Sequence, residues 1–297
     1  MHILISGASG LIGTQLSAHF ELTGHQVTRL VRRSAGPNEV FWSPALGELN
    51  PSSIEGVDAV VHLSGAGIAD KRWSNSYKKE ILESRTKSTD LLARTLASLS
   101  RKPAVLLSGS AIGIYGARED LPLDETSSLG TSFLADVCQQ WESAANAAKN
   151  AGIRTAFLRT GIVITSKGGA LKKQLPLFKL GLGGKFGSGK QWQSWITLDD
   201  EIRAIEFLLT APVSGAVNLT APNPVTNSEF TSTLARVLHR PALIPVPAIF
   251  PKLLLGSELA ESLLFSGQRV VPAILTANGF KFTHEHLDEA LRSLLNK

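Results

Sequence analysis

The sequence predicts an α/β fold in which helices cover both faces of a doubly wound parallel sheet, followed by a smaller C-terminal α+β domain. Residues 1–165 alternate short apolar runs with longer amphipathic segments, as βαβ units do. A glycine-rich turn joins the first apolar run to the first amphipathic segment, and beyond residue 165 the alternation gives way to irregular segments rich in glycine and proline. We therefore expect a Rossmann domain at residues 1–165 and a substrate-side domain at residues 166–297, some of whose elements return to the sheet.

The expected strands are apolar runs bounded by turn residues, at 3–6, 26–31, 58–63, 104–108 and 154–159. Amphipathic periodicity predicts helices at 11–23, 76–98, 133–150 and 202–209. Thr197 and Asp200 have the spacing of a capping box ahead of the last of these helices. From residue 227 onward we expect two or three further helices, ending in an amphipathic segment at 286–295.

Composition and charge are typical of a globular protein with a large core. Hydrophobic residues make up 43% and charged residues 19% of the 297 residues. The net charge of +5 is spread over scattered basic pairs without interleaved aromatic residues, so we expect no nucleic-acid partner and no membrane partner. A homodimer is the candidate assembly.

One cysteine, Cys138, and seven scattered histidines give neither an internal disulfide nor a metal-ligand cluster, so we expect no metal site. Residues 1–6 run directly into an apolar segment and leave no room for a signal peptide. No apolar stretch reaches the roughly 18 residues of a spanning helix. We expect a cytoplasmic protein.

The glycine-rich turn is the strongest functional motif. It follows an expected strand and opens an expected helix, the context in which such glycines permit a tight turn and the approach of a pyrophosphate to the helix N-terminus. In this context it predicts dinucleotide binding, whereas the glycines alone would be compatible with an ordinary turn. The expected cofactor contacts are Gly7, Ser9, Gly10, Leu11, Ile12 and Gly13.

The second expected strand is followed by Arg32 and Arg33, about 20 residues past the loop, where a carboxylate would hold the ribose of NAD. An arginine there accommodates the 2′-phosphate of NADP, and no acid follows Arg33 before Glu39. Arg32 therefore favours NADP(H) as cofactor. The alternative is a solvated basic turn.

A family resemblance rests on the segments 7–13, 60–67, 71–73, 79–85, 108–116, 133–142, 180–189, 191–196 and 266–272. These segments resemble extended or atypical short-chain dehydrogenases/reductases, and more specifically the YfcH-type (SulA-like) NAD(P)-dependent epimerase family. The resemblance covers essentially the whole chain.

The resemblance implies a Rossmann fold, NADP(H) and an activity assigned by analogy, but no substrate. It also implies cofactor contacts beyond the glycine loop, namely Arg32, His62, Leu63, Gly65, Glu80, Arg85 and Val163. Packing is the alternative for each: His62 as a core histidine, Glu80 and Arg85 as a pair on a helix surface.

Catalysis in the superfamily to which this resemblance points uses a tyrosine with a lysine four residues later. Neither tyrosine has that lysine, because Ile81 follows Tyr77 and Glu119 follows Tyr115 at that spacing. Aligned on Glu142, the tyrosine position falls on Leu134 and the lysine position on Cys138, which we expect to be buried and inert. The remaining catalytic candidates are Ser110, as the group polarising a carbonyl, and Tyr115, for which a structural role is the alternative.

The glycine-rich loop 181–195 is the candidate substrate-side element. Its glycines would let backbone wrap a ligand, and its charged and aromatic side chains could bind a nucleotide-like or acidic group; these are Lys185, Lys190, Trp192 and Trp195. Alternatively, the tryptophans complete a core between the two domains.

The cofactor side predicts an NADP(H)-dependent oxidoreductase or epimerase acting on an unknown small polar substrate, nucleotide-sugar-like in its chemistry, without the usual Tyr-x-x-x-Lys. The missing acid/base pair supports an alternative, a non-catalytic NADP(H)-binding sensor or regulatory protein related to cell division. A flavin or nucleotide-sugar protein on the same fold is a third hypothesis, which Arg32 disfavours.

Overall fold

An eight-stranded sheet forms the centre of the computed structural model, which describes residues 1–296. Its strand order is β12-β8-β6-β5-β1-β2-β3-β4, with β4 antiparallel to β3 and every other pair parallel. The strands are β1 (His2–Ser6), β2 (Gln26–Val31), β3 (Glu39–Ser43), β4 (Glu48–Leu49), β5 (Ala59–His62), β6 (Val105–Ala111), β8 (Arg154–Thr160) and β12 (Gly215–Leu219).

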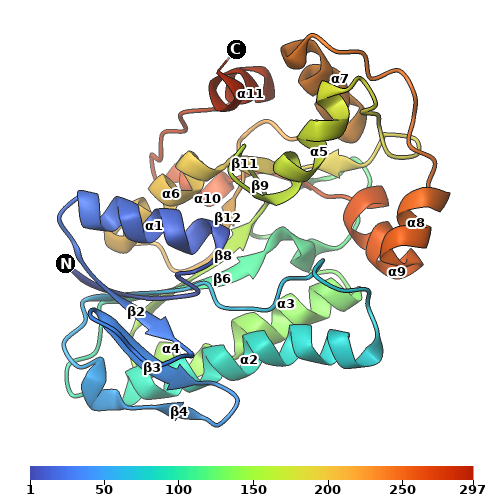
Figure 1. Cartoon of the computed structure of the whole chain (residues 1–297). Helices are drawn as coiled ribbons and strands as arrows, with labels where there is room; N and C mark the ends of the chain where they lie inside the picture. The colour runs from blue at the N-terminus through green and yellow to red at the C-terminus, as the bar shows by residue number, and fades with distance from the viewer. Residues whose placement is uncertain (297) are drawn as a thin grey trace.

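Helices cover both faces of this sheet (Figure 1). One face carries α1 (Leu11–Leu22) and α6 (Leu198–Thr210), and the other carries α2 (Asn75–Ser98), α3 (Phe133–Ser143) and α4 (Asn146–Asn150). The expected doubly wound Rossmann fold is confirmed.

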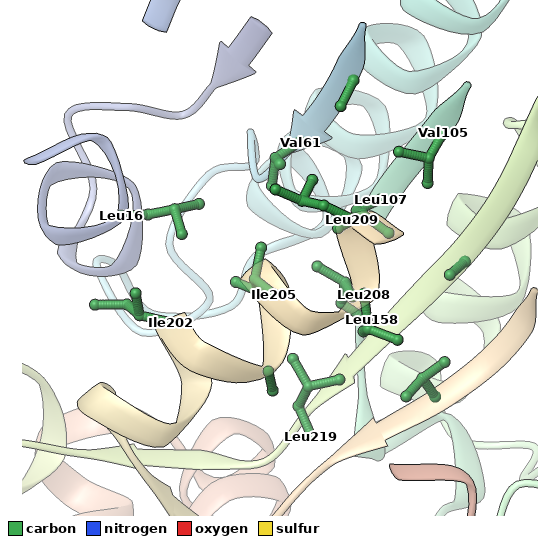
Figure 2. Close-up of a cluster of buried hydrophobic side chains, with 14 of the residues drawn as sticks. Leu16, Val61, Val105, Leu107, Leu158, Ile202, Ile205, Leu208, Leu209 and Leu219 are labelled. Atoms are coloured by element: carbon green, nitrogen blue, oxygen red, sulfur yellow. The ribbon is translucent and has the colours of Figure 1, made fainter. Parts of the chain in front are cut away.

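Alternation along the strands builds the core on both sides of the sheet. On β1, Ile3 and Ile5 pack towards α1 and α6, whereas Leu4 joins the cluster beneath α2. Figure 2 shows the first cluster, in which Leu16 of α1 and Ile205 of α6 approach the strand residue Val61. The central strands are continuous apolar runs because helices cover both faces of the sheet.

The chain reverses its direction across the sheet between β1 and β5. From β1 it proceeds to β2 and β3 on one side, and the later strands β5, β6, β8 and β12 fill the other side. In open α/β sheets, ligands bind in the crevice outside the carboxyl ends of the strands at such a switch point. We therefore expect a ligand site to be formed by the residues that follow β1 and β5.

The rest of the chain packs as smaller units around α5, α7 and α11, which bury a separate apolar cluster. The remaining helices are α5 (Gly169–Lys179), α7 (Asn227–Leu238), α8 (Ile249–Leu255), α9 (Ser257–Ala260), α10 (Ala273–Ala277) and α11 (Leu287–Leu295). Three short pairings complete the structure: β9 (Ile162–Ile164) with β11 (Trp195–Thr197), β10 (Trp192–Gln193) with β13 (Val225–Thr226), and β7 (Pro122–Leu123) with β14 (Arg269–Val270).

Strand β12 joins the Rossmann sheet and helix α6 packs on it, although both follow residue 165. The division of the chain at that residue stays a prediction. Among residues 1–296, no helix is both long enough and apolar enough to span a bilayer.

The structure differs from the expected elements in several places. The single helix expected at 133–150 is two helices, because i→i+3 bonds such as Ala145 N–H to Glu142 C=O tighten its middle. Thr197 caps the N–H of Asp200 as expected, but the Asp200 carboxylate accepts the N–H groups of Thr283 and His284 and so makes no reciprocal box. Strands β3, β4 and β12 had no counterpart in the sequence pattern, and residues 227–296 form five α-helices instead of the two or three expected.

Candidate functional site

A cleft of about 1280 Å³ opens at the carboxyl ends of β1, β2 and β5, at the switch point of the sheet. Five segments line it: the glycine loop at 7–10, the end of β2 at 29–33, the hairpin at 42–45, the loop at 63–67, and one face of α2. Of the residues singled out from the sequence, the lining includes Gly7, Ser9, Gly10, Arg32, Leu63, Gly65 and Glu80.

The glycine loop requires its glycines for steric reasons. Gly7 has φ +71°, and a Cβ there would lie 2.7 Å from the carbonyl carbon of Leu63. A Cβ on Gly13 would lie 2.2 Å from the Gly7 oxygen, so Gly13 allows α1 to pack directly on the loop. Close packing of this kind brings the start of α1 to the floor of the cleft.

The N-terminus of α1 is open to an anion. Its N-cap, Gly10, has no side-chain oxygen, and the first turn carries no acidic residue. The N–H groups of Leu11, Ile12 and Gly13 have no acceptor within the helix. Since the Leu11 and Ile12 side chains pack against the core, these residues can offer the cleft only backbone N–H groups and the positive end of the helix dipole.

The two arginines after β2 differ in their partners. Arg33 donates hydrogen bonds of 2.7 and 2.6 Å to the two carboxylate oxygens of Glu39. These bonds, with one from the Gly36 N–H, lower the pKa of Glu39 to about 2. Arg32 has no hydrogen bond or ion pair to any of residues 1–296, and the pairing of Ser6 with Leu30 places it beside the glycine loop. The cleft therefore contains an unpaired guanidinium next to a helix N-terminus.

His62 does not face the cleft with its ring, which corrects the expectation of a cofactor contact through this side chain. Its imidazole is fully buried, with Nδ1 2.5 Å from the Ser6 hydroxyl and Nε2 2.9 Å from that of Thr89. Burial lowers the pKa of His62 to about 3, so the ring is neutral. It is a core histidine whose hydrogen bonds tie β1 and β5 to α2.

Arg85 approaches the cleft from behind the loop at 63–67. Its guanidinium stacks on Trp141 at 5.1 Å and lies against Gly65, where a Cβ would come within 3.1 Å of it. The Ile81 carbonyl is its one hydrogen-bond acceptor among the described residues, and burial lowers the pKa of Arg85. Glu80 does not pair with it but lies 3.3 Å from the Lys71 ammonium, so the surface pair that was the alternative to cofactor contact is absent from the described structure.

Val163 lies at the same edge of the sheet. It packs with Ala8, Leu11 and Leu63 against the core beneath the glycine loop, and β9 places it beside Ile196 of β11. This position adjoins the cleft without contributing to its lining.

Both catalytic candidates are engaged in a buried polar network. Ser110 donates to Glu142 at 2.7 Å, and Arg159 donates to both oxygens of the same carboxylate at 2.9 and 3.0 Å. Arg159 also donates to the Tyr115 hydroxyl at 2.9 Å, which in turn donates to Asn218 at 2.7 Å.

This network corrects the expected catalytic roles. Tyr115 is fully buried, burial raises its pKa, and its proton is directed to Asn218. The hydroxyl proton of Ser110 is directed to Glu142 in the same way. In this structure neither side chain is placed to exchange a proton with a ligand, and the network instead ties β6, α3, β8 and β12 together.

The positions of the usual tyrosine and lysine are apolar. Leu134 contacts the loop after β6 near Gly113, and Cys138 belongs to the buried cluster around Tyr115. Cys138 is buried as expected, and burial raises its pKa to about 12, which disfavours the reactive thiolate.

The loop expected to contact substrate divides into buried and exposed parts. Trp195 is fully buried in the C-terminal cluster and donates to the Asn223 carbonyl, so the expectation that it stacks on a substrate is wrong. Trp192 is half-buried, donates to Asp120 at 2.7 Å and is covered on one face by Arg269 at 4.6 Å. Lys185 is half-buried and Lys190 is exposed; neither ammonium has a carboxylate partner among residues 1–296.

The sequence pattern did not reveal the role of Glu201. It lies in the first turn of α6 and is fully buried. Burial raises its pKa to about 8. One oxygen accepts the Thr160 hydroxyl at 2.8 Å, and the other has no partner within residues 1–296. Nothing local distinguishes it from its exposed neighbour Asp199, so only the packing of α6 on β8 could identify it.

Comparison with known proteins adds family information to this geometry. A sequence profile described as "NAD dependent epimerase/dehydratase family" matches residues 3–220, and one described as "Domain of unknown function (DUF1731)" matches residues 246–294. Epimerase family protein Mb2239 of Mycobacterium bovis is 43% identical over 291 residues, which span 97% of this chain and 96% of that protein.

Solved structures are similar over the full length. The human epimerase family protein SDR39U1, crystallised with NADPH, superposes with a TM-score of 0.91 at 32% identity and covers 100% of both chains. A Corynebacterium glutamicum protein described as a nucleoside-diphosphate sugar epimerase has a TM-score of 0.81 at 35% identity, covering 99% of this chain and 58% of that one.

Proposed function

The chain belongs to the NAD dependent epimerase/dehydratase family, and from this premise we propose that it is an NADP(H)-dependent oxidoreductase or epimerase of the short-chain dehydrogenase type. Its substrate in this proposal is a small polar molecule of the nucleotide-sugar type, and its location is cytoplasmic. The YfcH-type subgroup is part of the same proposal.

The observation that carries the proposal is the unpaired Arg32 beside the open N-terminus of α1. A dinucleotide with a 2′-phosphate needs an anion site for its pyrophosphate and a cation for the additional phosphate. The glycine loop and Arg32 supply these two groups within one cleft, and Arg33 neutralises the nearest carboxylate, Glu39. The human relative crystallised with NADPH supports the same cofactor.

The residues present fit such a cofactor, since the cleft measures about 1280 Å³ and the glycines at 7 and 13 permit the close backbone packing that brings the start of α1 to it. Backbone N–H groups at 11–13 would hold the pyrophosphate, and Arg32 the 2′-phosphate. Leu63 and Gly65 would form the wall after β5, and Val163 would support that wall from the core without touching the cofactor. The cofactor, when bound, supplies hydride transfer.

Arg85 contributes the positive charge that the family pattern otherwise takes from lysine. The lysine position is the buried thiol of Cys138, whereas the guanidinium of Arg85 lies against Gly65 at the cleft wall. Because it has no carboxylate partner among the described residues, its charge remains available to an anionic or hydroxyl group of a ligand.

The nucleotide-sugar class is supported by the Corynebacterium relative, described as a nucleoside-diphosphate sugar epimerase, and by Lys185 and Lys190 on the substrate-side loop. Two lysines without carboxylate partners could pair with a diphosphate. Trp192 offers its uncovered face to a ring.

Calorimetric titration with NADPH and NADH, on the wild type and on Arg32→Glu, tests the cofactor. We expect NADPH to bind more tightly than NADH, and the variant to lose that preference. Equal affinities of the wild type for NADPH and NADH, or a preference for NADPH that survives in Arg32→Glu, would refute the proposed role of Arg32. If NADPH binds tightly but no hydride is transferred with any of a panel of nucleotide sugars, the enzymatic part of the proposal is refuted and the sensor hypothesis is favoured.

A further inference from the structure

A large apolar surface lies outside the cleft, around helix α8. Nine large apolar side chains on it are between 52% and 87% exposed. We call it the α8 surface; its members are Leu177, Leu180, Leu182, Leu243, Ile244, Ile249, Phe250, Leu253 and Leu254. Monomeric proteins rarely expose so many large apolar groups together, and such patches mark interaction sites.

The segments that form the α8 surface adjoin one another in space. The Val246 N–H donates to the Lys185 carbonyl, and the Gly187 N–H donates to the Val246 carbonyl. A Cβ on Gly181 would lie 3.3 Å from Pro241. The loop between α7 and α8 and helix α8 itself follow the right-hand side of the molecule in Figure 1.

Helix α8 presents one apolar face outward. Ile249, Phe250, Leu253 and Leu254 recur at the spacing of a single helical face, whereas Pro251 is buried on the other side. Arg72 donates to the carbonyls of Leu253 and Leu254, which fixes the end of the helix against the loop after β5. The apolar face is therefore held in place by the fold and does not depend on a partner to form.

The charged groups around this surface are basic. Residues 143–198 contain no aspartate or glutamate, so the lysines at 172, 173, 179, 185 and 190 have no acidic neighbours along the chain. Arg240 donates only to the carbonyls of Lys179 and His239. Beyond α8, the carboxylates of Glu258 and Glu261 are each paired with a lysine. The α8 surface is apolar with an uncompensated positive rim.

The positive rim of the α8 surface favours one kind of binding partner over another. A second copy of the chain, docked patch to patch about a twofold axis, would bring the two basic rims together, and like charges at an interface are unfavourable. An anionic lipid surface complements both features, because apolar side chains enter the boundary of the acyl chains while lysines contact the headgroups.

We propose that the α8 surface binds peripherally to a bilayer that contains anionic lipids. The protein would lie on the membrane without crossing it, in agreement with the absence of a spanning helix among residues 1–296. The scattered basic pairs had suggested no membrane partner. The tertiary structure leads to a different proposal, because it brings Lys179 beside Arg240 and Lys185 beside Val246, next to the apolar side chains of 243–254.

Co-sedimentation of the full chain with vesicles tests the proposal. One set of vesicles is phosphatidylcholine alone, and the other is phosphatidylcholine and phosphatidylglycerol in equal parts. We expect binding to the second set only, weakened by added salt. The variant Leu253→Gln/Leu254→Gln should bind about tenfold more weakly, whereas Leu22→Gln/Leu46→Gln, which alters equally exposed leucines elsewhere, should bind as the wild type does.

Two charge-reversal variants test the contribution of the positive rim of the α8 surface. Lys179→Glu/Arg240→Glu, on exposed cations beside the apolar side chains, should reduce binding to phosphatidylglycerol vesicles, and Lys102→Glu/Lys281→Glu, on exposed lysines outside the rim, should reduce it less. Unchanged urea midpoints verify that each variant is folded.

Three results would overturn the proposal: no binding to either vesicle set, equal loss in the target and control leucine variants, or a dimer in solution that Leu253→Gln/Leu254→Gln dissociates. The last result would assign the surface to a second copy. None of these results depends on cofactor binding, so they leave the proposed function unaffected.

Discussion

The carboxylate of Glu39 is held by Arg33 through two hydrogen bonds, of 2.6 and 2.7 Å, at the mouth of the cleft. This pair removes the negative charge that would otherwise oppose a phosphate, and it leaves the neighbouring Arg32 unpaired. Which of two adjacent arginines can bind a ligand is thus decided by a third residue.

Removing Arg33 should expose that carboxylate. In Arg33→Gln we expect NADPH to bind about fivefold more weakly because Glu39 repels the 2′-phosphate, with little change for NADH. The double variant Arg33→Gln/Glu39→Gln should recover NADPH affinity. Calorimetric dissociation constants for the three proteins measure this, and equal NADPH affinities in the wild type and the single variant would contradict it.

Gly13→Ala should disrupt the glycine loop. Alanine normally stabilises a helix, but here its Cβ would lie 2.2 Å from the Gly7 oxygen. We expect the free energy of unfolding to fall by about 2–3 kcal/mol, together with a loss of NADPH binding. Gly113→Ala is the control, because its Cβ would meet only the Leu134 Cβ, at 3.6 Å. Urea unfolding measures the stability of both variants. Similar free energies of unfolding for Gly13→Ala and Gly113→Ala would contradict the predicted clash at Gly13.

Arg85→Met should separate binding from stability. The guanidinium has no carboxylate partner among the described residues, so its removal eliminates a poorly compensated charge and should not lower the free energy of unfolding. We expect NADPH affinity to fall by about tenfold. Arg94→Met, on the same helix but paired with Asp90 at the surface, should leave the affinity unchanged. A purely structural role for Arg85 would give the reverse result, lower stability with normal affinity.

Glu201 should make stability depend on pH. Burial raises its pKa in the folded protein from 4.5 to about 8, so between these values the folded state binds a proton that the unfolded state has released. The contribution of this proton to the free energy of unfolding is complete below about pH 4.5 and is lost as the pH rises towards 8. The free energy of unfolding then falls by up to about 1.4 kcal/mol per pH unit.

The variant Glu201→Gln has no such proton and can still accept the Thr160 hydroxyl. Relative to the wild type, it should therefore gain stability as the pH is raised from 5.5 to 7.5. Urea unfolding at the two pH values measures the difference between the proteins, from which the contributions of other titrating groups cancel. A difference that does not change with pH would show that Glu201 is ionised in the folded state.

Local features of the sequence determined much of the fold and of the cofactor-side geometry. Strand β2 was predicted with its observed bounds, and β1, β5, β6 and β8 within a few residues, because apolar runs between turn residues are a local signal. The glycine loop was identified for the same reason, since its strand, turn and helix are consecutive. Strand β4 was missed because it has only two residues. Strand β3 was missed because no helix separates it from β2, and β12 because it lies beyond residue 165, where the strand–helix alternation gives way to irregular segments.

Side-chain availability was decided only by the tertiary structure. Tyr115 donates to Asn218, 103 residues away, and one oxygen of Glu201 accepts from Thr160, 41 residues away. His62 and Trp195 are polar or amphipathic residues in plausible positions, yet both are enclosed by side chains from distant elements. The sequence by itself determined which backbone approaches a ligand, because the glycine loop is a local structure. Which polar side chains remain free to meet that ligand depended on partners that only the folded chain brings together.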